Sequence, residues 1–458
     1  MKAFLVVLVV EASAIVHDLL PKTTVTIDPN TTFVIFGMRH GNRNPGKFVK
    51  TTQAWGQEGT MELTSIGKRQ SYGLGRELRS YLGNFVSRNF LPSEATFYTS
   101  SANRCQATLQ SALAGIYDPV DWAVWNKESL RNWSPVPYTI DDPLLRMYVV
   151  AGCTKSGQVW KPILNDTLPD LAKITHDNMA LLNYMHAMDG REPTLSNAAD
   201  ISDNIIVMEF LNITYPDWLA NPSLPGYTKD TIKSAFQAFD EIHSVRCATY
   251  DPCRNLMGGL WADRISKALT AAARGDAKSP KLIGYSSHSE ITQSVMILLG
   301  IDKTELTTSA GFVIELKNNT KPVMVRLLAH DPNPIDAHVI YKATLFPELA
   351  AKADASGWIP LYTLTAYVAH TSFSDYKAAC GMAVPQCTVQ AASLSSSADS
   401  TSAPTVVKSS LVFSPPGPPS MLPPSATQNL PPLQPGFRYF YQPISRWTRY
   451  DEIEKSVQ

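Results

Sequence analysis

The sequence predicts an α/β fold in which helices flank a mixed central sheet and a helical insertion interrupts the chain. Three apolar runs, at residues 33–36, 95–99 and 281–286, have the length and composition of buried strands. Each run is followed by a polar loop and then by apolar residues at helical spacing. Between about residues 152 and 255 the pattern is mostly helical. We therefore expect functional groups in the loops where the strands end, as in other open α/β sheets.

The first two strands each lead into a helix. The first helix is expected to reach Leu82 from a cap at Thr64 or Ser65, and its apolar residues recur at helical spacing. The strand at residues 95–99 leads into a second helix that contains Ile116. These two strand–helix units predict the start of an α/β domain.

The later part of the chain continues the pattern. A helix is expected from Met257 through Leu269, and the strand at 281–286 is followed directly by another helix. Two further runs, at 310–316 and 323–329, predict an antiparallel pair at the edge of the sheet. We predict four segments: a signal peptide over 1–14, an α/β domain over 25–150 and 256–388, a helical cap insertion over 151–255, and a tail over 389–458.

The overall composition is that of a soluble globular protein. Of the 458 residues, 44% are apolar, and the 40 basic side chains equal the 40 acidic ones. A net charge of zero gives no reason to expect nucleic acid or an anionic membrane surface as a partner. A run of about 18 apolar residues is absent from the sequence, so we expect no membrane span.

Several features predict export from the cell. The first residues resemble a secretory signal, with a positive Lys2, an apolar stretch and a small-residue cleavage site at 12–14. Six cysteines fit an oxidising compartment. Five Asn-x-Ser/Thr sequons predict N-glycosylation, at Asn30, Asn132, Asn165, Asn212 and Asn318. We therefore expect a secreted or lysosomal glycoprotein.

The C-terminal segment differs from the rest in composition. Residues 391–402 are rich in serine, and residues 404–435 contain ten prolines and few charges. Such a segment cannot bury enough apolar surface to offset the entropy lost on ordering. We expect it to be disordered or polyproline-like.

The stretch Met38–Pro45 places a histidine between two arginines directly after the first strand. Arginine guanidinium groups fit phosphate oxygens, and a histidine ring nitrogen can act as a nucleophile toward phosphorus. Gly41 allows a ligand to approach the backbone closely. A solvated turn can contain the same residue types. The longer pattern Arg-His-Gly-x-Arg-x-Pro after a strand favours phosphoryl transfer through a phosphohistidine.

This octapeptide resembles the signature of the histidine acid phosphatases, the secreted branch of the histidine phosphatase superfamily. Leu63–Gln70 resembles the Leu-Thr-x-x-Gly-x-x-Gln helix of the family, and Trp133–Pro137 resembles its Trp-x-Pro-Ile-Pro segment. The combination is similar to the prostatic and lysosomal acid phosphatases of animals. The resemblance implies the histidine phosphatase fold and an acid phosphatase that uses a phosphohistidine and no metal or other cofactor.

Five residues are candidates for the phosphoryl site. His40 is the candidate nucleophile, Arg39 and Arg43 flank it, and Arg104 and His288 follow other strands. Arg104 opens a helix, where backbone N–H groups also face an anion. Its position resembles that of a third phosphate-binding arginine in the family. Taken alone, Arg104 would be a surface arginine and His288 a structural histidine, but their shared placement at strand ends favours binding of the phosphoryl oxygens.

The expected proton donor departs from the family pattern. In the family the second histidine is followed by an aspartate that protonates the leaving group, whereas here His288 is followed by Ser289 and Glu290. A serine hydroxyl hardly ionises near neutral pH and is a poor general acid. Glu290 is the candidate donor, and the inositol-polyphosphate phosphatases of the superfamily use a similar His-Ala-Glu arrangement. Alternatively, Glu290 only stabilises the first turn of its helix.

The six cysteines are Cys105, Cys153, Cys247, Cys253, Cys380 and Cys387. The resemblance implies a bridge between Cys153 and Cys380 that joins the insertion to the C-terminal edge. Cys247 and Cys253 are close enough in sequence to pair. Cys105 is expected to be a buried thiol, and a bridge from it to the sixth cysteine is a further possibility.

The leading functional hypothesis is an acid phosphatase that acts on a small-molecule or phosphopeptide monoester, in which Glu290 gives and later takes the proton. An inositol-polyphosphate substrate is an alternative that only Glu290 suggests. A catalytically weak homologue that binds phosphorylated ligands is a second alternative, based on the missing aspartate. A cytosolic mutase-like transferase shares the loop around His40, but the signal, sequons and cysteines argue against it. Homologues of this type are often homodimers.

Overall fold

A computed structural model describes residues 23–125, 133–276, 278–333, 335–373 and 375–382. The expected signal peptide, the sequon at Asn132, Cys387 and the expected tail lie outside the described residues. All described residues belong to one compact unit.

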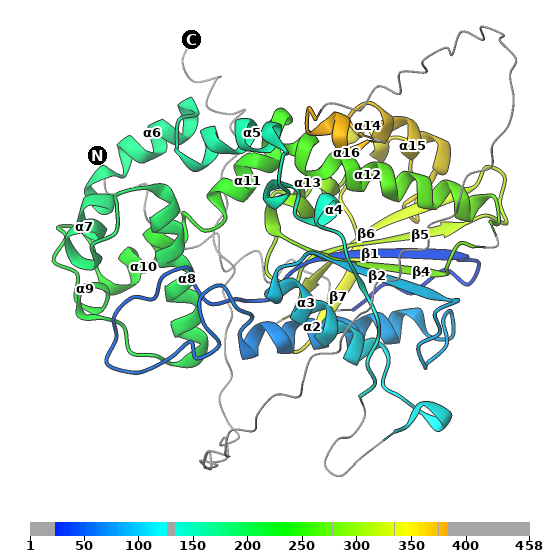
Figure 1. The fold of residues 1–458 in the computed structure, drawn as a ribbon, viewed down its shortest axis with the longest axis horizontal. Helices are drawn as coiled ribbons and strands as arrows, with labels where there is room; N and C mark the ends of the chain where they lie inside the picture. Colours follow the sequence, from blue (N-terminus) through cyan, green and yellow to red (C-terminus); the bar gives the residue numbers. More distant parts are fainter. Residues whose placement is uncertain (1–22, 126–132, 277, 334, 374, 383–458) are drawn as a thin grey trace, which may run out of the picture. The chain divides into compact units, whose positions relative to one another are not determined.

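A mixed sheet of eight strands forms the centre of the fold (Figure 1). Its strands follow the order β3-β2-β4-β1-β5-β6-β7, and β8 pairs with β6 beside this path. Strands β1 to β4 pair in parallel, and the remaining pairs are antiparallel. The bounds are β1 Phe33–Arg39, β2 Ala95–Thr99, β3 Thr139–Ile140, β4 Leu282–Ser287, β5 Gly311–Lys317, β6 Met324–Pro332, β7 His338–Lys342 and β8 Trp358–Pro360.

The three expected buried strands are present as β1, β2 and β4. The antiparallel pair expected from residues 310–316 and 323–329 is also present, as β5 and β6, but its expected position at the sheet edge is wrong. β5 pairs with β1, and β6 pairs with both β7 and β8. Almost every residue of β5 is buried, as an interior position requires. Beyond β6 lie β7, of five residues, and β8, of three, and sequence analysis predicted neither of these strands.

Helices cover both faces of the sheet, with α2 and α3 on one face and α12, α13 and α15 on the other (Figure 1). Residues of β1 alternate between the two layers. Val34 and Phe36 pack with the apolar residues of α2 and α3, whereas Phe33 and Ile35 pack with those of α12 and α13. The bounds of the helices in these layers and of the short flanking helices are α2 Ser65–Leu82, α3 Asn103–Ile116, η1 Asp121–Ala123, α12 Asp251–Ala273, α13 Ser289–Leu298, α14 Pro347–Ala350, α15 Leu361–Ala369 and α16 Tyr376–Ala379.

Local sequence explains where two of these helices begin. Thr64 caps α2, since its hydroxyl accepts a hydrogen bond from the Gly67 backbone N–H at 3.1 Å. Helix α12 begins at Asp251, six residues before the expected start at Met257, because Pro252 suits the first turn of a helix.

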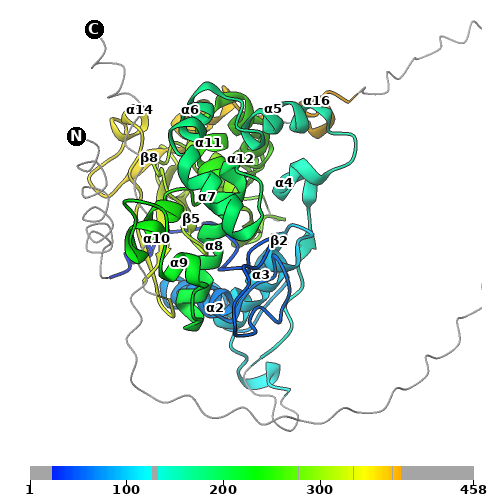
Figure 2. The ribbon, with the colours of Figure 1, turned by 90° about the vertical axis from the view of Figure 1, so that its left-hand side faces the viewer.

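The chain between β3 and β4 consists almost entirely of helices, as expected (Figure 2). Apolar residues of this insertion, such as Leu181, Ile201 and Phe236, belong to the same buried cluster as Phe33 and Ile35 of the sheet. Because this core is continuous, the division into a cap and an α/β domain stays a prediction. The bounds are α4 Asp142–Leu145, η2 Met147–Val149, α5 Thr154–Leu164, α6 Pro169–Asp177, α7 Met179–Asp189, α8 Leu195–Leu211, α9 Asp217–Ala220, α10 Lys229–Gln237 and α11 Ile242–Thr249.

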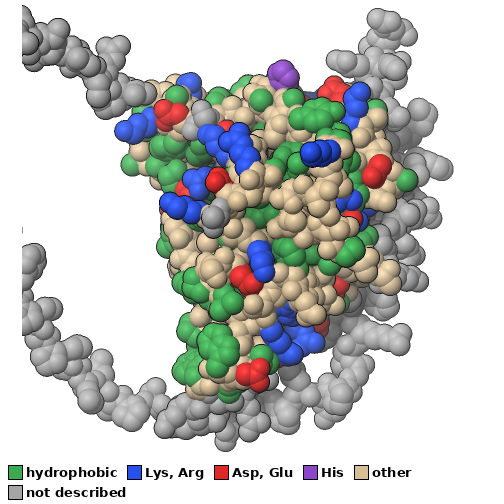
Figure 3. All heavy atoms as spheres, turned by 90° about the vertical axis from the view of Figure 1, so that its right-hand side faces the viewer, with side chains coloured by type: hydrophobic (Ala, Val, Ile, Leu, Met, Phe, Trp, Pro, Cys, Tyr) green, Lys and Arg blue, Asp and Glu red, His purple; other side chains and the backbone are tan. Residues whose placement is uncertain are grey.

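The surface of the described residues carries both signs of charge. On the face shown in Figure 3, Lys and Arg side chains are interspersed with Asp and Glu. Within the described ranges, none of the helices has the length and apolar character needed to cross a bilayer. Three described sequon residues, Asn30, Asn165 and Asn212, are exposed, and their glycosylation stays a prediction.

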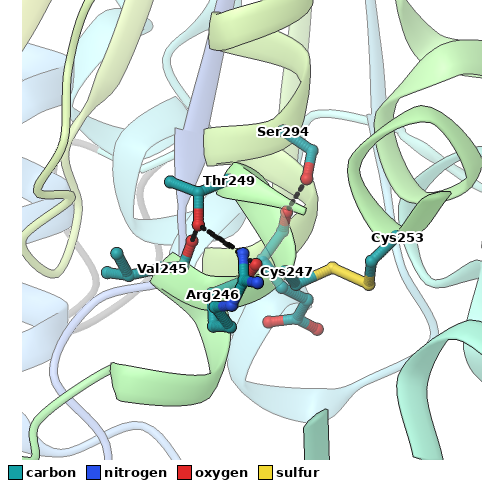
Figure 4. The surroundings of a disulfide bond; sticks show 7 residues. Val245, Arg246, Cys247, Thr249, Cys253 and Ser294 are labelled. Atoms are coloured by element: carbon teal, nitrogen blue, oxygen red, sulfur yellow. Dashed lines mark hydrogen bonds between the residues drawn. A yellow bond between two sulfur atoms is a disulfide. The ribbon is translucent and has the colours of Figure 1, made fainter. Parts of the chain in front are cut away.

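Two disulfide bonds join the pairs expected from the sequence. Cys153 bonds to Cys380, at a sequence separation of 227, and Cys247 bonds to Cys253. The second bond fixes the end of α11 to the start of α12 (Figure 4). Cys105 is a buried free thiol, as expected.

Candidate active site

The parallel pairing of β1 with β4 brings the two candidate histidines together. Arg39 pairs with Ser287 in the register of these strands, so His40 and His288 each follow the end of a neighbouring strand. The backbone N–H of His40 donates to the Ser287 carbonyl at 2.9 Å. The two imidazole rings meet edge to face, with their centroids 5.7 Å apart. Both residues are buried.

The loop that carries His40 is held by hydrogen bonds from three directions. The Gly41 N–H donates to the Thr108 hydroxyl of α3 and the Asn42 N–H to the Gln70 side chain of α2, each at 2.9 Å. The His40 carbonyl accepts from the Ser309 N–H at 3.0 Å. A Cβ atom at Gly41 would lie 2.5 Å from the Gly67 carbonyl oxygen, so close contact with α2 requires a glycine here. The loop is therefore fixed before any ligand binds.

The imidazole of His40 is set up as a neutral ring with one free nitrogen. Its Nδ1 lies 2.9 Å from the carbonyl oxygen of Gly41, and a carbonyl only accepts, so Nδ1 carries the proton. Burial holds the pKa of His40 well below its usual value, and the charges of Arg104, Arg39 and Arg43 lower it further. The lone pair is therefore on Nε2.

Two of the candidate arginines are paired with carboxylates of the helical insertion. Arg39 donates to the Leu306 carbonyl at 2.6 Å and forms an ion pair with Glu241. Arg43 forms an ion pair with Asp203 of α8 at 2.8 Å. Sequence analysis found no motif for either carboxylate, because both lie in the insertion, far from the loop in the chain. Together they link the insertion to the loop around His40.

Arg104 and Arg146 both act on His288. Neither arginine forms an ion pair with a carboxylate of the described residues. Arg104 donates from Nη2 to Nδ1 of His288 at 3.1 Å. Arg146 lies beside the Tyr148 ring and contributes to lowering the pKa of His288. The Nε atoms of Arg39, Arg104 and Arg146 are buried and have no hydrogen-bond partner. Sequence analysis missed Arg146, which follows α4 without a recognisable motif.

His288 is already engaged at both ring nitrogens. Because an arginine only donates, its Nδ1 accepts from Arg104, and its Nε2–H therefore donates to the Ser100 hydroxyl at 3.0 Å. His288 therefore orients the Arg104 side chain. A direct contact between His288 and a phosphoryl oxygen stays a prediction. Burial lowers its pKa well below the usual value, followed by the charges of Arg104 and Arg146.

Three carboxyl groups other than Asp203 lie near these residues: Asp240, Glu290 and Glu241. Burial and the charges of Glu241 and Asp203 hold the pKa of Asp240 well above its usual value. Glu290, in the first turn of α13, is buried, and burial raises the pKa of its carboxyl despite hydrogen bonds from its own backbone N–H and the Tyr148 hydroxyl. Glu241 precedes α11 and has a pKa below its usual value: burial raises it, but the charges of Arg39 and Arg43 and hydrogen bonds from Ser289 and Ser244 together lower it by more. A group of three or more His, Cys, Asp or Glu side chains able to hold a metal ion does not occur among the described residues.

Comparison with known proteins identifies the class. Residues 30–325 match the family model of the Histidine phosphatase superfamily (branch 2). The chain belongs to this family, as its sequence motifs predicted. Lysosomal acid phosphatase of Xenopus laevis is 25% identical over 278 residues, which cover 59% of this chain and 62% of that protein. Prostatic acid phosphatase of Mus musculus is 21% identical over 277 residues, which cover 59% of this chain and 70% of that protein. The similarity therefore spans less than two thirds of the Xenopus protein.

Solved structures share the fold. The apo form of Hafnia alvei phytase superposes with a TM-score of 0.56 at 13% identity, over 78% of this chain and 99% of that one. Its complex with myo-inositol hexakis sulphate gives a TM-score of 0.57 at 12% identity, over 77% and 99% of the two chains. At this level of identity the likeness shows the histidine phosphatase fold and nothing about the substrate.

Proposed function

We propose that this protein hydrolyses phosphate monoesters at acid pH through a phosphohistidine on His40. The setting of the His40 ring carries this proposal. Its Nδ1 proton is directed to Gly41, its Nε2 lone pair is free, and three arginine side chains act on it electrostatically. A neutral imidazole among cationic donors suits attack on a phosphoryl group, because the donors hold the phosphoryl oxygens while the ring supplies an electron pair.

The proposed reaction has two steps. In the first, Nε2 of His40 attacks phosphorus, a P–N bond forms, and the ester P–O bond breaks. The leaving oxygen keeps the electron pair of that bond and receives a proton from a carboxylic acid. In the second, water gives a proton to the resulting carboxylate and attacks phosphorus. The P–N bond then breaks, its electrons return to Nε2, and inorganic phosphate is released.

The charged side chains around His40 support binding of a single phosphoryl group. Arg39, Arg43 and Arg104 are proposed to hold its oxygens, with His288 orienting Arg104. Arg39 and Arg43 are already paired with Glu241 and Asp203, whereas Arg104 and Arg146 make no ion pair with a described carboxylate. The proposed substrate is a small-molecule or phosphopeptide monoester, and an inositol polyphosphate stays the alternative.

The proton donor must differ from that of the family, since Ser289 stands where the family has an aspartate. The sequence predicts Glu290 for this role, and its raised pKa supports a protonated form. Its carboxylate, however, is held by its own backbone N–H and by Tyr148. This is also how a carboxylate stabilises the first turn of a helix.

The features that predict export also support the expected acid environment. Sequons, two disulfides and the sequence of the first residues favour action in a secreted or lysosomal setting. A neutral His40 remains a nucleophile at low pH because burial and the neighbouring arginines hold its pKa well below its usual value.

Turnover of p-nitrophenyl phosphate between about pH 4 and 7 by the wild type and by His40→Ala tests the proposal. We expect wild-type hydrolysis that is lost in the variant. Equal release of p-nitrophenol by both proteins, or none by either, would contradict the proposal. Phosphate binding without turnover would instead support the alternative, a homologue that binds phosphorylated ligands. This alternative is based on the missing aspartate and on the arginines that are already paired.

A further inference from the structure

Arg146 is held close to the ends of two parallel strands. It follows the short helix α4, and the carbonyl of the residue before it, Leu145, accepts a hydrogen bond from the Ser287 hydroxyl at 2.8 Å. Ser287 is the last residue of β4, one position before the second candidate histidine. At the start of the same segment, the Asp141 N–H donates to the carbonyl of Thr99, at the end of β2, at 2.9 Å. The backbone that carries Arg146 is therefore fixed to the strand ends from which the candidate site is built.

The Arg146 side chain lies at the rim of the candidate site. The Tyr148 ring is a neighbour of both Arg146 and His288: its centroid is 5.9 Å from Cζ of the arginine and 5.9 Å from the centroid of the imidazole. The charge of Arg146 lowers the pKa of His288, after burial and the charge of Arg104. Its Nε atom is buried, whereas its Nη1 atom lies 3.5 Å from the hydroxyl oxygen of the exposed Ser101. One end of the guanidinium group is thus inside the site, and the other is accessible to a ligand.

The carboxylates that lie nearest to Arg146 in the chain are engaged with other groups. Asp142 accepts a hydrogen bond from the Ser101 N–H at 2.7 Å, and Asp141 faces Arg264 of α12 at 3.9 Å. Within the part of the chain that the structure describes, Arg146 forms no ion pair of its own. A guanidinium group that is fixed in place and unpaired is suited to a carboxylate ligand, because its planar N–H groups match the two carboxylate oxygens.

We propose that Arg146 binds a carboxylate that the alcohol part of the substrate carries close to the ester. This inference rests on the proposed phosphomonoesterase function and names the class of its substrate, the phosphate ester of a hydroxy acid. The other three arginines of the site are proposed to hold the phosphoryl oxygens, which leaves Arg146 for a second anionic group. A single guanidinium group balances the charge of one carboxylate, whereas a second phosphate dianion requires more than one cation.

Two substrates that differ in one group test this assignment. Glycerol 2-phosphate and 2-phosphoglycerate carry the phosphate on the same carbon, but the second has a carboxylate in place of a hydroxymethyl group. At about pH 5 this carboxylate is ionised. We expect the wild type to have the higher kcat/KM with 2-phosphoglycerate. We expect Arg146→Met to lower the ratio of the two kcat/KM values by about tenfold, because a hydrogen bond between two charged groups is lost.

Two further variants make the result specific. Arg146→Lys keeps the positive charge, and we expect it to retain the wild-type ratio within about threefold. Arg264→Met removes a cation that faces the same segment from α12, and we expect the ratio to stay unchanged because solvent screens this exposed side chain. The ratio of the two substrates is independent of the folded fraction, so partial misfolding of a variant does not affect the result.

The outcomes separate this assignment from the proposed function. A wild type that prefers glycerol 2-phosphate, or an Arg146→Met variant that loses the same factor with both substrates, would overturn the assignment and leave the phosphatase proposal standing. An equal fall of the ratio in Arg264→Met would also overturn it, since overall charge would then attract the carboxylate. If neither substrate is hydrolysed in a way that depends on His40, the phosphatase proposal itself is overturned.

Discussion

The two halves of the candidate site are built in different ways. The half proposed to attack phosphorus lies at the ends of β1 and β4, where strand register and backbone hydrogen bonds fix His40. The half that contains the nearby carboxyl groups is assembled from the insertion and from α13, through side chains such as Glu241 and Glu290. A site can thus keep its nucleophile in a local motif while its proton donor depends on contacts between distant parts of the chain.

The largest effect is expected in the attacking half. Arg104→Ala removes a half-buried guanidinium that acts on His40 and contacts His288. We expect kcat/KM to fall by about 10²–10³-fold with both p-nitrophenyl phosphate and glycerol 2-phosphate, because the arginine stabilises charge on the phosphoryl oxygens. Steady-state kinetics of the purified variant measure the loss. A change with only one of the substrates would contradict its place in this half.

The loop that carries His40 depends on a glycine in the neighbouring helix. A Cβ atom at Gly67 would lie 2.2 Å from the Asn42 carbonyl oxygen, so Gly67→Ala must displace the loop. A displacement of about 1 Å can lower the rate by about 10²-fold, and we expect this loss with both substrates. Gly157→Ala in α5 is the matched control, since its Cβ would meet no atom within 4 Å. Equal activity of the two variants would show that the loop adapts.

The two disulfides should separate stability from proton delivery. Replacing both Cys153 and Cys380 by alanine should lower the free energy of unfolding by about 2–5 kcal/mol, because the bond closes a long loop. The ratio of activity on the two substrates should stay unchanged. Replacing Cys247 and Cys253 loosens the insertion, from which the half with the carboxyl groups is assembled. Activity on glycerol 2-phosphate, whose leaving oxygen needs a proton, should then fall on the order of tenfold relative to p-nitrophenyl phosphate. Denaturant unfolding and kinetics on both double variants provide the comparison.

The smallest expected effect is a shift in pH dependence. Arg104 is the largest charge that lowers the pKa of His40 after burial itself. Removing it by Arg104→Met makes the protonated ring less unfavourable, so the pKa of His40 rises. The acid limb of residual kcat/KM should then move to higher pH than in the wild type. Arg146→Met is the control, because Arg146 acts on His288. An unchanged limb in Arg104→Met would show that His40 does not control it.

The sequence predicted the residues gathered around His40 because their signals are local. The buried strands, the loop after β1 and the cap at Thr64 are all encoded within a few residues, and the structure places His40, Arg104 and His288 together. The position of β5 and β6 inside the sheet was not predicted, because sequence analysis identified neither β7 nor β8 as a strand. Glu241 and Arg146 carry no motif, and only the packing of the insertion against the loop brings them to the site.

Direct detection of the phosphoenzyme tests the central claim most directly. The wild type is mixed with p-nitrophenyl phosphate at acid pH and quenched in alkali within the first turnovers, and its peptides are analysed by mass spectrometry. We predict phosphate on the peptide that contains His40 and none in His40→Ala treated in the same way. Wild-type turnover without a phosphorylated His40, or a phosphoenzyme that persists in His40→Ala, would contradict the account.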